Sequence, residues 1–298
     1  MAVGKLFRVF LNMMDDKTYL SLRYRYATGK KIHWNNPKEF NEKLLWLMVH
    51  DHNPKYKVLV DKFEVKKYIA QLIGEEYVIP LLAVGERFED IDFDSLPNQF
   101  VVKCNHDSGG IVICKDKSQF DYEAAKNLIN SHLDKEFYRI TREWPYRDIK
   151  RKVIVEKYME DQNNESGGEL RDYKFYCFNG EPKFLYLSQG LTNHETAKIN
   201  YVSLEWEKEE FYREDYKQFD VLPGKPTNFE KMIDLAKVLS QGFPFVRVDL
   251  YEINQKIYFG EMTLYPGAGI TEFFPDKWNA VLGDYIDITQ MKRSVKNE

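Results

Sequence analysis

The sequence is poor in the residue that stabilises small secreted proteins. Its 298 residues include only three cysteines, Cys104, Cys114 and Cys177, which is an odd number without the spacing of a metal-binding motif. This pattern excludes a disulfide framework and is typical of reduced thiols in the cytoplasm. A chain of this length can bury a core that needs neither disulfides nor a structural metal. We therefore expect a cytoplasmic protein.

Long hydrophobic runs are also missing. No segment approaches the roughly 20 apolar residues that cross a membrane, and the start of the chain has no long apolar stretch of the secretory kind. Residues 5–11 are amphipathic, and such a segment either packs on a core, which we favour, or rests on a membrane surface. A peripheral contact at the inner face of the membrane is therefore compatible with the sequence.

Neither positively nor negatively charged residues are in large excess. The chain has 43 Lys and Arg against 47 Asp and Glu, a net charge of −4, whereas nucleic-acid-binding proteins show a strong basic excess. Nucleic acid is therefore not an expected partner. There is no Gly-Lys-Ser/Thr of a Walker A loop and no convincing Ser/His/Asp or Cys/His set, so we expect neither a P-loop nor a covalent nucleophile. With 43% hydrophobic and 30% charged residues, the composition is that of a globular chain.

Strand and helix patterns alternate without a regular βαβ period, which predicts the α+β class. Strand patterns occupy residues 77–82, 100–104, 110–114, 153–158, 173–178 and 182–187. Asn179-Gly180 joins the last two segments and is a strong hairpin signal. Helices are predicted from Asn36, with Pro37 at the first helical position, at 56–73 and 121–133, and from Thr227. The acidic connection 86–97 is the expected domain boundary.

Two apolar segments near the end of the chain carry unexpected charges. Residues 245–250 and 259–264 predict a β-hairpin. By the two-residue strand period Arg247 and Asp249 share one face, and Asp249 can lie nearly opposite Glu261. A divalent cation would remove the repulsion between the two carboxylates, and oxygen ligands favour Mg²⁺ or Mn²⁺ with phosphates completing the octahedron. The alternative is an ordinary hairpin whose carboxylates face water.

Lys103 ends an apolar strand directly before the Ser/Gly-rich loop 105–110. Backbone amides of such a loop, together with one ammonium group, can wrap phosphate oxygens. A plain surface turn would explain the same residues. Lys103 therefore indicates a phosphate site only in combination with the other motifs.

In their order along the chain, these motifs resemble the ATP-grasp superfamily. The resemblance is carried by Asp61-Lys62, residues 100–103 and 153–159, Arg247-x-Asp249 and Glu261-x-Thr263. Further sequence motifs are similar to those of the TupA-like branch, which is associated with bacterial teichuronopeptide and surface-polysaccharide synthesis. These motifs are Asn41-Glu42-Lys43-x-x-Trp46, Ile79-Pro80, Leu96-Pro97, Lys103-x-Asn105-His106 and Tyr265-Pro266-Gly267. The resemblance runs from residue 35 to residue 285.

This resemblance implies an ATP-grasp fold. The nucleotide would lie between a small lid subdomain and a larger antiparallel-sheet core, preceded by a helical N-terminal region. On this division residues 1–95 form the N-terminal region, 96–160 the lid and 161–298 the core with the metal site. ATP and Mg²⁺, or Mn²⁺, are the implied cofactors.

The resemblance also implies a nucleotide site. Its residues are Lys62, Lys103, Asn105, Ser108, Gly109, Gly110, Glu156, Lys157, Tyr158, Met159 and Asp172. Lys62 and Lys103 would contact phosphates, and residues 105–110 would form a mobile flap over the nucleotide. Glu156 would accept a hydrogen bond from the adenine amino group, and the backbone of 157–159 would complete the purine edge. A solvated strand end remains the alternative for Glu156.

Asp249 and Glu261 match the family's metal-binding carboxylates, and Arg247 matches an arginine that reaches the transferring phosphate. Thr263 stands where the superfamily usually has Asn, so the third protein ligand is a hydroxyl, a water or absent.

Asp172 and Lys174 resemble the Asp-x-Arg of glutamate-ligating members. Lysine keeps the charge but loses the bidentate geometry of arginine. Together with Lys103 and Arg247, Lys174 would form the catalytic set that spreads the charge on the transferring phosphoryl group.

The implied activity is that of an ATP-dependent carboxylate–amine ligase working through an acyl phosphate. Its partners would be a uronic acid or glycan carboxylate and an amino acid amine, or the reverse with a peptide. The basic aromatic segment 144–147 either receives an anionic sugar or leads, solvated, into the next strand. Two other functions stay open. One is a nucleotide-sugar glycosyltransferase using the acidic cluster 90–94, and the other is a catalytically silent ATP-binding scaffold.

Overall fold

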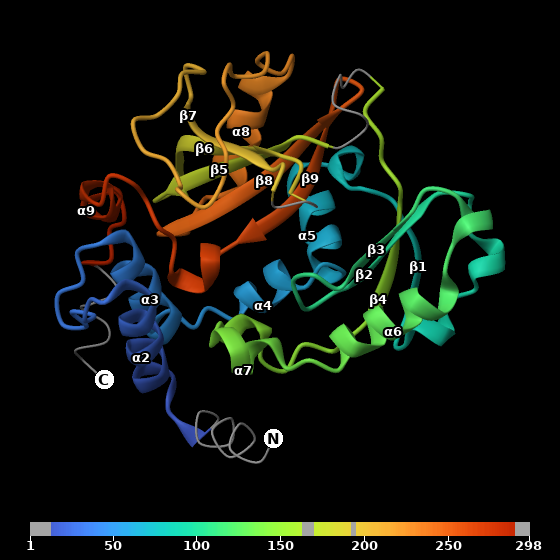
Figure 1. Ribbon diagram of the computed structural model, residues 1–298, viewed down its shortest axis with the longest axis horizontal. Coiled ribbons are helices and arrows are strands. Elements are labelled where there is room, and N and C mark those ends of the chain that lie inside the picture. Colours follow the sequence, from blue (N-terminus) through green and yellow to red (C-terminus); the bar gives the residue numbers. More distant parts are fainter. Residues whose placement is uncertain (1–12, 163–169, 192–194, 290–298) are drawn as a thin grey trace.

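The computed structural model describes residues 13–162, 170–191 and 195–289, in which two antiparallel sheets face each other across the molecule (Figure 1). One sheet has four strands in the order β1-β4-β2-β3, and the other has five in the order β7-β6-β5-β8-β9. Each sheet has a hydrophobic core of its own, and the core on the five-stranded sheet is the larger one. This arrangement confirms the predicted α+β class. The amphipathic segment 5–11 lies outside the described residues.

The four-stranded sheet is built from short strands rich in Val, Ile and Phe. Its strands are β1 (Leu81–Gly85), β2 (Phe100–Cys104), β3 (Ile111–Cys114) and β4 (Val153–Lys157). Helix α6 (Tyr122–Leu133) covers one face and begins where the Asp121 side chain accepts a hydrogen bond from the amide of Ala124. The predicted strands at 100–104 and 110–114 and the helix at 121–133 are confirmed.

The five-stranded sheet forms the larger half. Its strands are β5 (Asp172–Phe178), β6 (Glu181–Gln189), β7 (Lys198–Ser203), β8 (Phe245–Ile253) and β9 (Lys256–Thr263). Helix α8 (Phe229–Leu239) packs its buried side chains on this sheet. Two-residue turns join two strand pairs, one at Asn179-Gly180 as predicted and one at Asn254-Gln255, and all four residues have the positive φ of such turns.

The remaining helices lie mainly between and beside the sheets (Figure 1). They are α2 (Asp16–Thr28), α3 (Phe40–His50), α4 (Lys55–Val60), α5 (Glu64–Ile73), α7 (Phe137–Thr141) and α9 (Lys277–Asp284). The prediction that a helix starts near Asn36 and Pro37 is wrong, because α3 begins at Phe40. Glu39 and Glu42 form a reciprocal capping box there, which fixes the first turn three residues later.

The predicted helix at 56–73 is two helices. The side chain of Asp61 accepts hydrogen bonds from the amides of Phe63 and Glu64, which ends α4 and starts α5. Leu72 near the end of α5 is 42% exposed. The strand predicted at 77–82 is shifted as well, because residues 75–77 form a 3-10 turn and β1 begins at Leu81.

The division at residues 95 and 160 stays a prediction. Strand β1, which lies before residue 96, pairs with β4 of the predicted lid, so the four-stranded sheet itself begins at Leu81. Among the residues that the structure describes, no helix has the length and apolar character needed to cross a membrane.

Candidate nucleotide and metal site

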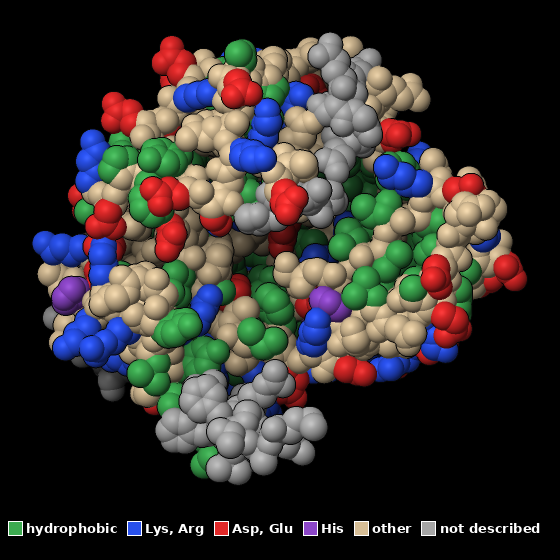
Figure 2. All heavy atoms as spheres, viewed as in Figure 1, with side chains coloured by type: hydrophobic (Ala, Val, Ile, Leu, Met, Phe, Trp, Pro, Cys, Tyr) green, Lys and Arg blue, Asp and Glu red, His purple; other side chains and the backbone are tan. Residues whose placement is uncertain are grey.

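A cavity of about 830 Å³ lies between the two sheets. Its walls come from β2, β3, β4 and α6 on one side and from Asp172 of β5 and Tyr251 of β8 on the other. Figure 2 shows a hollow at this level, with hydrophobic side chains on the side of the four-stranded sheet. Apolar lining is provided by Ile79, Ile111, Ile113, Leu128, Met159 and Leu170. Such a cavity suits a planar ligand with a charged tail.

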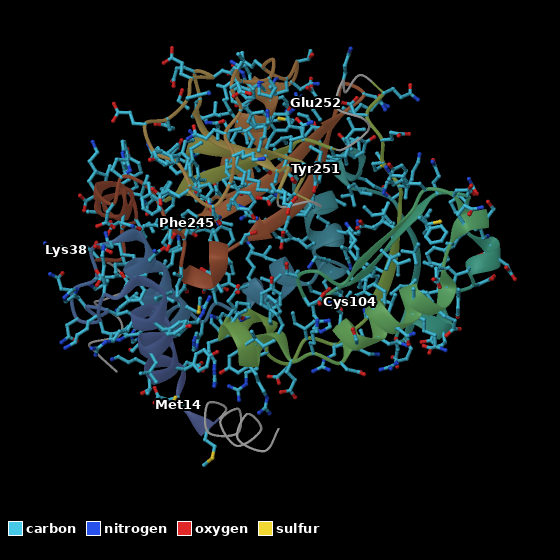
Figure 3. All side chains as sticks on the ribbon, viewed as in Figure 1. Met14, Lys38, Cys104, Phe245, Tyr251 and Glu252 are labelled. Carbon is cyan, nitrogen blue, oxygen red and sulfur yellow. The ribbon has the colours of Figure 1, made fainter. Side chains whose placement is uncertain are left out.

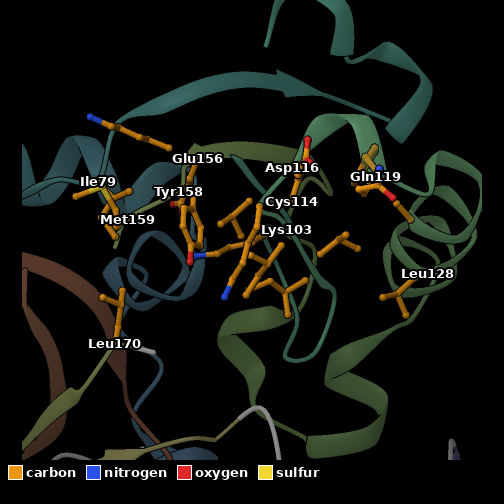
Figure 4. Close-up of a pocket in the computed structure, with 18 of the residues that line it drawn as sticks. Ile79, Lys103, Cys114, Asp116, Gln119, Leu128, Glu156, Tyr158, Met159 and Leu170 are labelled. Carbon is orange, nitrogen blue, oxygen red and sulfur yellow. The ribbon is translucent and has the colours of Figure 1, made fainter. Parts of the chain in front are cut away.

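Six of the predicted nucleotide-binding residues line this cavity. They are Lys103, Glu156, Lys157, Tyr158, Met159 and Asp172. Figure 4 labels Lys103, Glu156, Tyr158 and Met159 among them. The other five, Lys62, Asn105, Ser108, Gly109 and Gly110, are not part of its wall. The predicted residues on the strands and their ends therefore lie together in the cavity wall, whereas the glycine loop is not part of this wall.

Glu156 is held between two lysines in the cavity wall. Its side chain is 7% exposed, with one oxygen 2.6 Å from the Lys103 ammonium and the other 2.6 Å from the Lys66 ammonium. Burial alone would raise the pKa of Glu156, but the two ammonium groups outweigh it and hold the pKa below its ordinary value. Two positive charges therefore flank one negative charge here, and Lys103 lines the cavity whereas Lys66 does not.

Lys66 is a residue that the sequence analysis missed. It lies on α5, four residues after Lys62, and also donates a hydrogen bond of 2.8 Å to the carbonyl of Ile79. In the predicted helix 56–73, the spacing of four residues from Lys62 was the available signal, because residues four apart share a helix face, although Lys62 lies before the start of α5. Its partner Glu156 is too distant in sequence for that pattern to reveal.

Asn105 has a structural position at the base of the loop. It is completely buried, and its amide nitrogen donates to the Asp61 carboxylate (2.9 Å) and to the carbonyl of Lys150 (3.0 Å). Its side-chain oxygen accepts from the amide of Lys152 at 2.7 Å. The side chain is thus fully used inside the protein, and it anchors the loop instead of facing the cavity.

The loop is tied down on two sides. The Lys62 ammonium donates to the carbonyl of Asp107 at 2.5 Å, and the Asp107 carboxylate lies 2.5 Å from the ring of His132 on α6. Ser108 and Gly109 are exposed at the tip, and Gly109 has a φ of +96° that favours glycine. Lys62 therefore sits against the loop whose role as a flap is predicted.

The charged hairpin has the predicted pairing. In the β8–β9 register Asp249 lies opposite Glu261 and Arg247 opposite Thr263. Asp249 is 2% exposed and accepts two hydrogen bonds of 2.7 Å from the Arg247 guanidinium. The same guanidinium donates to the Thr263 hydroxyl at 2.9 Å. The hairpin therefore presents a row of oxygen atoms fixed by one arginine.

Lys174 of β5 links this row to the cavity. Its ammonium lies 3.0 Å from the Asp172 carboxylate, which lines the cavity, and 3.1 Å from Asp249. Burial would raise the pKa of Asp249, but Arg247 and Lys174 hold it below its ordinary value. Two of the three predicted catalytic cations thus meet at Asp249, whereas the third, Lys103, lies with Glu156 in the other sheet.

Glu261 is the open carboxylate of the hairpin. Within the described ranges no hydrogen bond or ion pair engages it, and no third Asp, Glu, His or Cys joins it as a possible metal ligand. Opposite residues of antiparallel strands have Cβ atoms roughly 5 Å apart, so one ion can reach both carboxylates. Two carboxylates and the neighbouring Thr263 hydroxyl fit Mg²⁺, which keeps several waters and binds phosphate oxygens.

Glu143 and Arg23 are further residues that the sequence analysis missed. Glu143 follows α7, is 7% exposed and lies close enough to Arg23 and Glu261 for their charges to act on it. Burial, with Glu261 adding to it and Arg23 opposing it, raises the pKa of Glu143 to about 8. The aromatic segment 144–147 pointed to this region of the chain but not to its carboxylate.

The acidic cluster 90–94 has an ordinary structural role. All three of its aspartates are exposed, and the Asp90 and Asp92 carboxylates accept hydrogen bonds from backbone amides of their own turns. This cluster shows none of the burial or convergence of a nucleotide-sugar site.

Several solved structures are similar in fold. The D-alanine–D-alanine ligase from Helicobacter pylori has a TM-score of 0.47 and 15% identity, over 77% of this chain and 62% of that one. The D-alanine–D-alanine ligase from Bacillus anthracis, complexed with ATP, has a TM-score of 0.42 and 17% identity, over 81% and 67%. N5-carboxyaminoimidazole synthetase from Staphylococcus aureus, complexed with ADP, has a TM-score of 0.41 and 14% identity, over 85% and 52%. This chain thus spans less than two thirds of the Helicobacter ligase.

Family membership follows from the sequence itself. No curated protein sequence matches the chain. The model of the TupA-like ATP-grasp family matches residues 42–287, which include the cavity, the glycine loop and the charged hairpin. The chain belongs to the TupA-like ATP-grasp family.

Proposed function

We propose that this protein is an ATP-dependent ligase that joins a carboxylate to an amine. The observation that carries the proposal is a row of charged groups leading out of the cavity along β8. Tyr251 lines the cavity, and Asp249 and Arg247 follow at every second residue, so the row is about 13 Å long at 3.3 Å per residue. Figure 3 shows Tyr251 and Phe245 near opposite ends of this strand. A nucleotide base in the cavity would place its phosphates along the row.

The first chemical step needs two anions to approach each other. An oxygen of the substrate carboxylate attacks the γ-phosphorus of ATP, the bond to the β-phosphate oxygen breaks, and ADP leaves an acyl phosphate behind. Arg247 and Lys174 would neutralise the charge on the transferring group, because both cations are already fixed by Asp249. Mg²⁺, held by Asp249 and Glu261 beside the Thr263 hydroxyl, would supply further charge neutralisation.

The second step forms the amide. The amine nitrogen attacks the acyl carbon, the bond to the phosphate oxygen breaks, and the nitrogen loses its surplus proton as phosphate leaves. Water would destroy the acyl phosphate, so the site must exclude it. The loop 105–110, held at its base by Asn105 and beside Lys62, is the segment we propose as the cover.

The substrate classes follow from the association of the family with surface-polysaccharide synthesis. We propose a uronic acid or an acidic glycan as the carboxylate and an amino acid as the amine, in the cytoplasm or at the inner face of its membrane. This assignment rests on the family and on no contact in the structure.

The test is a screen of uronic acids against amino acids with ATP and Mg²⁺. ADP release is measured and the product is identified by mass spectrometry. We expect ADP and phosphate in equal amounts, with a product that is lighter than the two substrates together by one water. ATP binding without ADP release from any pair would instead favour the silent scaffold, and release of a nucleoside diphosphate from a nucleotide sugar would favour glycosyl transfer.

A further inference from the structure

A second cavity, of about 610 Å³, is lined by the start of α2, the loop after β2, α7 and the segment 146–151. Among the described residues, none lines both this cavity and the nucleotide cavity. The two cavities are nevertheless close, because Lys103 lines the first and His106 lines the second. The Cα atoms of residues three apart are separated by at most roughly 11 Å. A ligand in the second cavity would therefore lie beside the predicted flap 105–110.

Charged side chains make up most of the wall of the second cavity. Five cations and four carboxylates line it, and each carboxylate already has a partner. The ion pairs are Glu136–Arg139, Asp16–Arg142 and Asp148–Lys57. The fourth carboxylate, Asp15, caps α2 by accepting a hydrogen bond of 2.9 Å from the amide of Thr18. The negative charges of the wall are thus occupied within the chain.

Three cations of the wall have no carboxylate within ion-pair distance in the part of the chain that the structure describes. They are Lys135, Arg147 and Arg151. The Lys135 ammonium donates to the His132 ring at 2.8 Å, and the Arg151 guanidinium donates to the carbonyl of Leu133 at 3.1 Å. The Arg147 guanidinium lies over the Tyr138 ring, 5.5 Å from its centre. The surplus of positive charge favours an anionic ligand.

His106 adds an unpaired acceptor to the same wall. It is 3% exposed, and its Nε2 lies 3.3 Å from the carbonyl of Lys135, which can only accept a hydrogen bond. Nε2 therefore carries the proton, and burial lowers the pKa of His106, which keeps the ring neutral. Nδ1 is then an acceptor, and it has no hydrogen-bond partner among the described residues. A hydroxyl group can supply the missing donor.

We propose that the second cavity binds a sugar that carries a negative charge. The unpaired cations fit a carboxylate or phosphate group, and the acceptors of the wall fit sugar hydroxyls, which need both donors and acceptors. Tyr138 and Tyr146 also line the cavity and offer apolar ring faces to the carbon skeleton. The volume lies within the range of small-molecule sites, about 300–1,000 Å³.

The start of α2 gives this cavity a wall outside the residues 42–287 that match the family. In a role that rests on the ligase function proposed above, the cavity would hold a charged unit of the acidic glycan away from the reacting carboxylate. Binding itself needs neither ATP nor turnover, so it can be measured separately.

The first experiment is isothermal titration calorimetry of the unmodified protein, without ATP, with D-glucuronate, D-glucose 6-phosphate, D-glucose and acetate. We expect the preferred anionic sugar to bind at least tenfold more tightly than D-glucose, which lacks the charge, and than acetate, which lacks the hydroxyl groups. Tighter binding of D-glucuronate would assign a carboxylate to the ligand, and tighter binding of D-glucose 6-phosphate would assign a phosphate. Absence of binding by both anionic sugars, or equal affinity for D-glucose, would overturn the proposal.

The double variant Lys135→Gln, Arg147→Gln locates the site. Both side chains are exposed, so the melting temperature should stay near that of the wild type. The Kd of the preferred anionic sugar should rise at least tenfold, whereas the Kd of Mg·ADP should change less than twofold. Arg25→Gln with Lys183→Gln removes the same charge from exposed positions outside both cavities and should change neither Kd. An unchanged Kd of the sugar in the cavity variant would contradict the assignment.

A crystal soak gives a readout that needs no variant. Wild-type crystals soaked with the preferred anionic sugar should show it in contact with Arg147 and His106, and a sugar bound only in the nucleotide cavity would contradict the proposal. The ligase proposal fails differently. A protein that binds an anionic sugar in the second cavity but releases no ADP with any substrate pair would confirm this site and remove the ligase function.

Discussion

The two charged clusters of the site are unbalanced in opposite directions. The cavity cluster consists of Glu156, Lys66 and Lys103, with two positive charges against one negative. The hairpin cluster consists of Asp172, Lys174, Arg247, Asp249 and Glu261, with three negative charges against two positive. A surplus of positive charge favours an anion and a surplus of negative charge favours a cation. The pair of clusters therefore fits a phosphate chain and a divalent metal together.

The clusters also differ in how their carboxylates are engaged. Both oxygens of Glu156 are bound by ammonium groups, and Asp249 is bound by Arg247 and Lys174. Glu261 has no such partner in the ranges that the structure describes. Its charge is therefore the one most open to a metal ion, which makes it the first residue to change.

We expect the largest effect from Glu261→Gln. Removing one metal carboxylate loses several kcal/mol of charge stabilisation, so kcat should fall about a thousandfold, since each 1.4 kcal/mol is tenfold. Steady-state ADP release measures this. The melting temperature of the nucleotide-free variant should stay near that of the wild type, because no bond of the fold is removed. Glu205→Gln, which changes an exposed carboxylate, is the control. Near-normal turnover in Glu261→Gln would contradict the assignment of a metal ion to the hairpin cluster.

The next effect concerns Glu143, which adds a further carboxylate beside the hairpin cluster. Its raised pKa means that the folded protein holds the proton between the ordinary pKa of a glutamate and about 8. The stability of the metal-free protein should therefore fall as the pH rises through this window, with a slope approaching about 1.4 kcal/mol per pH unit from this group. The free energy of unfolding of Glu143→Gln, from urea titrations in EDTA, should lack this component. If the free energies of unfolding of the wild type and of Glu143→Gln changed in parallel with pH, the pKa of Glu143 would be an ordinary one and this prediction would be wrong.

The smallest effect is expected at the cavity cluster. Lys103→Ala removes one charge-assisted contact, worth about 1.5–3 kcal/mol, so the Kd of ATP should rise about tenfold to a hundredfold. The KM of the carboxylate substrate should change less, because we propose that this substrate binds beyond the hairpin cluster. Isothermal titration calorimetry measures the Kd, and Lys67→Ala on the exposed side of α5 is the control. An unchanged ATP affinity would show that the surplus positive charge of the cavity cluster does not contribute to ATP binding.

The same comparison shows what could be predicted from the sequence. The hairpin cluster lies mostly on two adjacent strands, so the two-residue period was enough to predict that Asp249 faces Glu261. The cavity cluster joins α5, β2 and β4, and no local period connects Lys66 to Glu156. Arg23 is farther still from its partners, since it meets carbonyls at 267 and 268 through tertiary packing alone.

Local patterns also failed where a polar side chain serves the backbone. Asp61 interrupts the predicted helix by accepting from two amides, and Glu42 moves the start of α3 by capping it. The side chain of Asn105 binds backbone groups and Asp61, and its contact with a nucleotide stays a prediction. The identity of such residues does not reveal whether they face a ligand or their own chain.

The most direct test of the account is a crystal structure with Mg²⁺ and a non-hydrolysable ATP analogue. We predict the base in the cavity against residues 156–159, the phosphates along β8, and one metal ion bound by both Asp249 and Glu261. A nucleotide bound elsewhere, or a metal ion that contacts neither carboxylate, would contradict it.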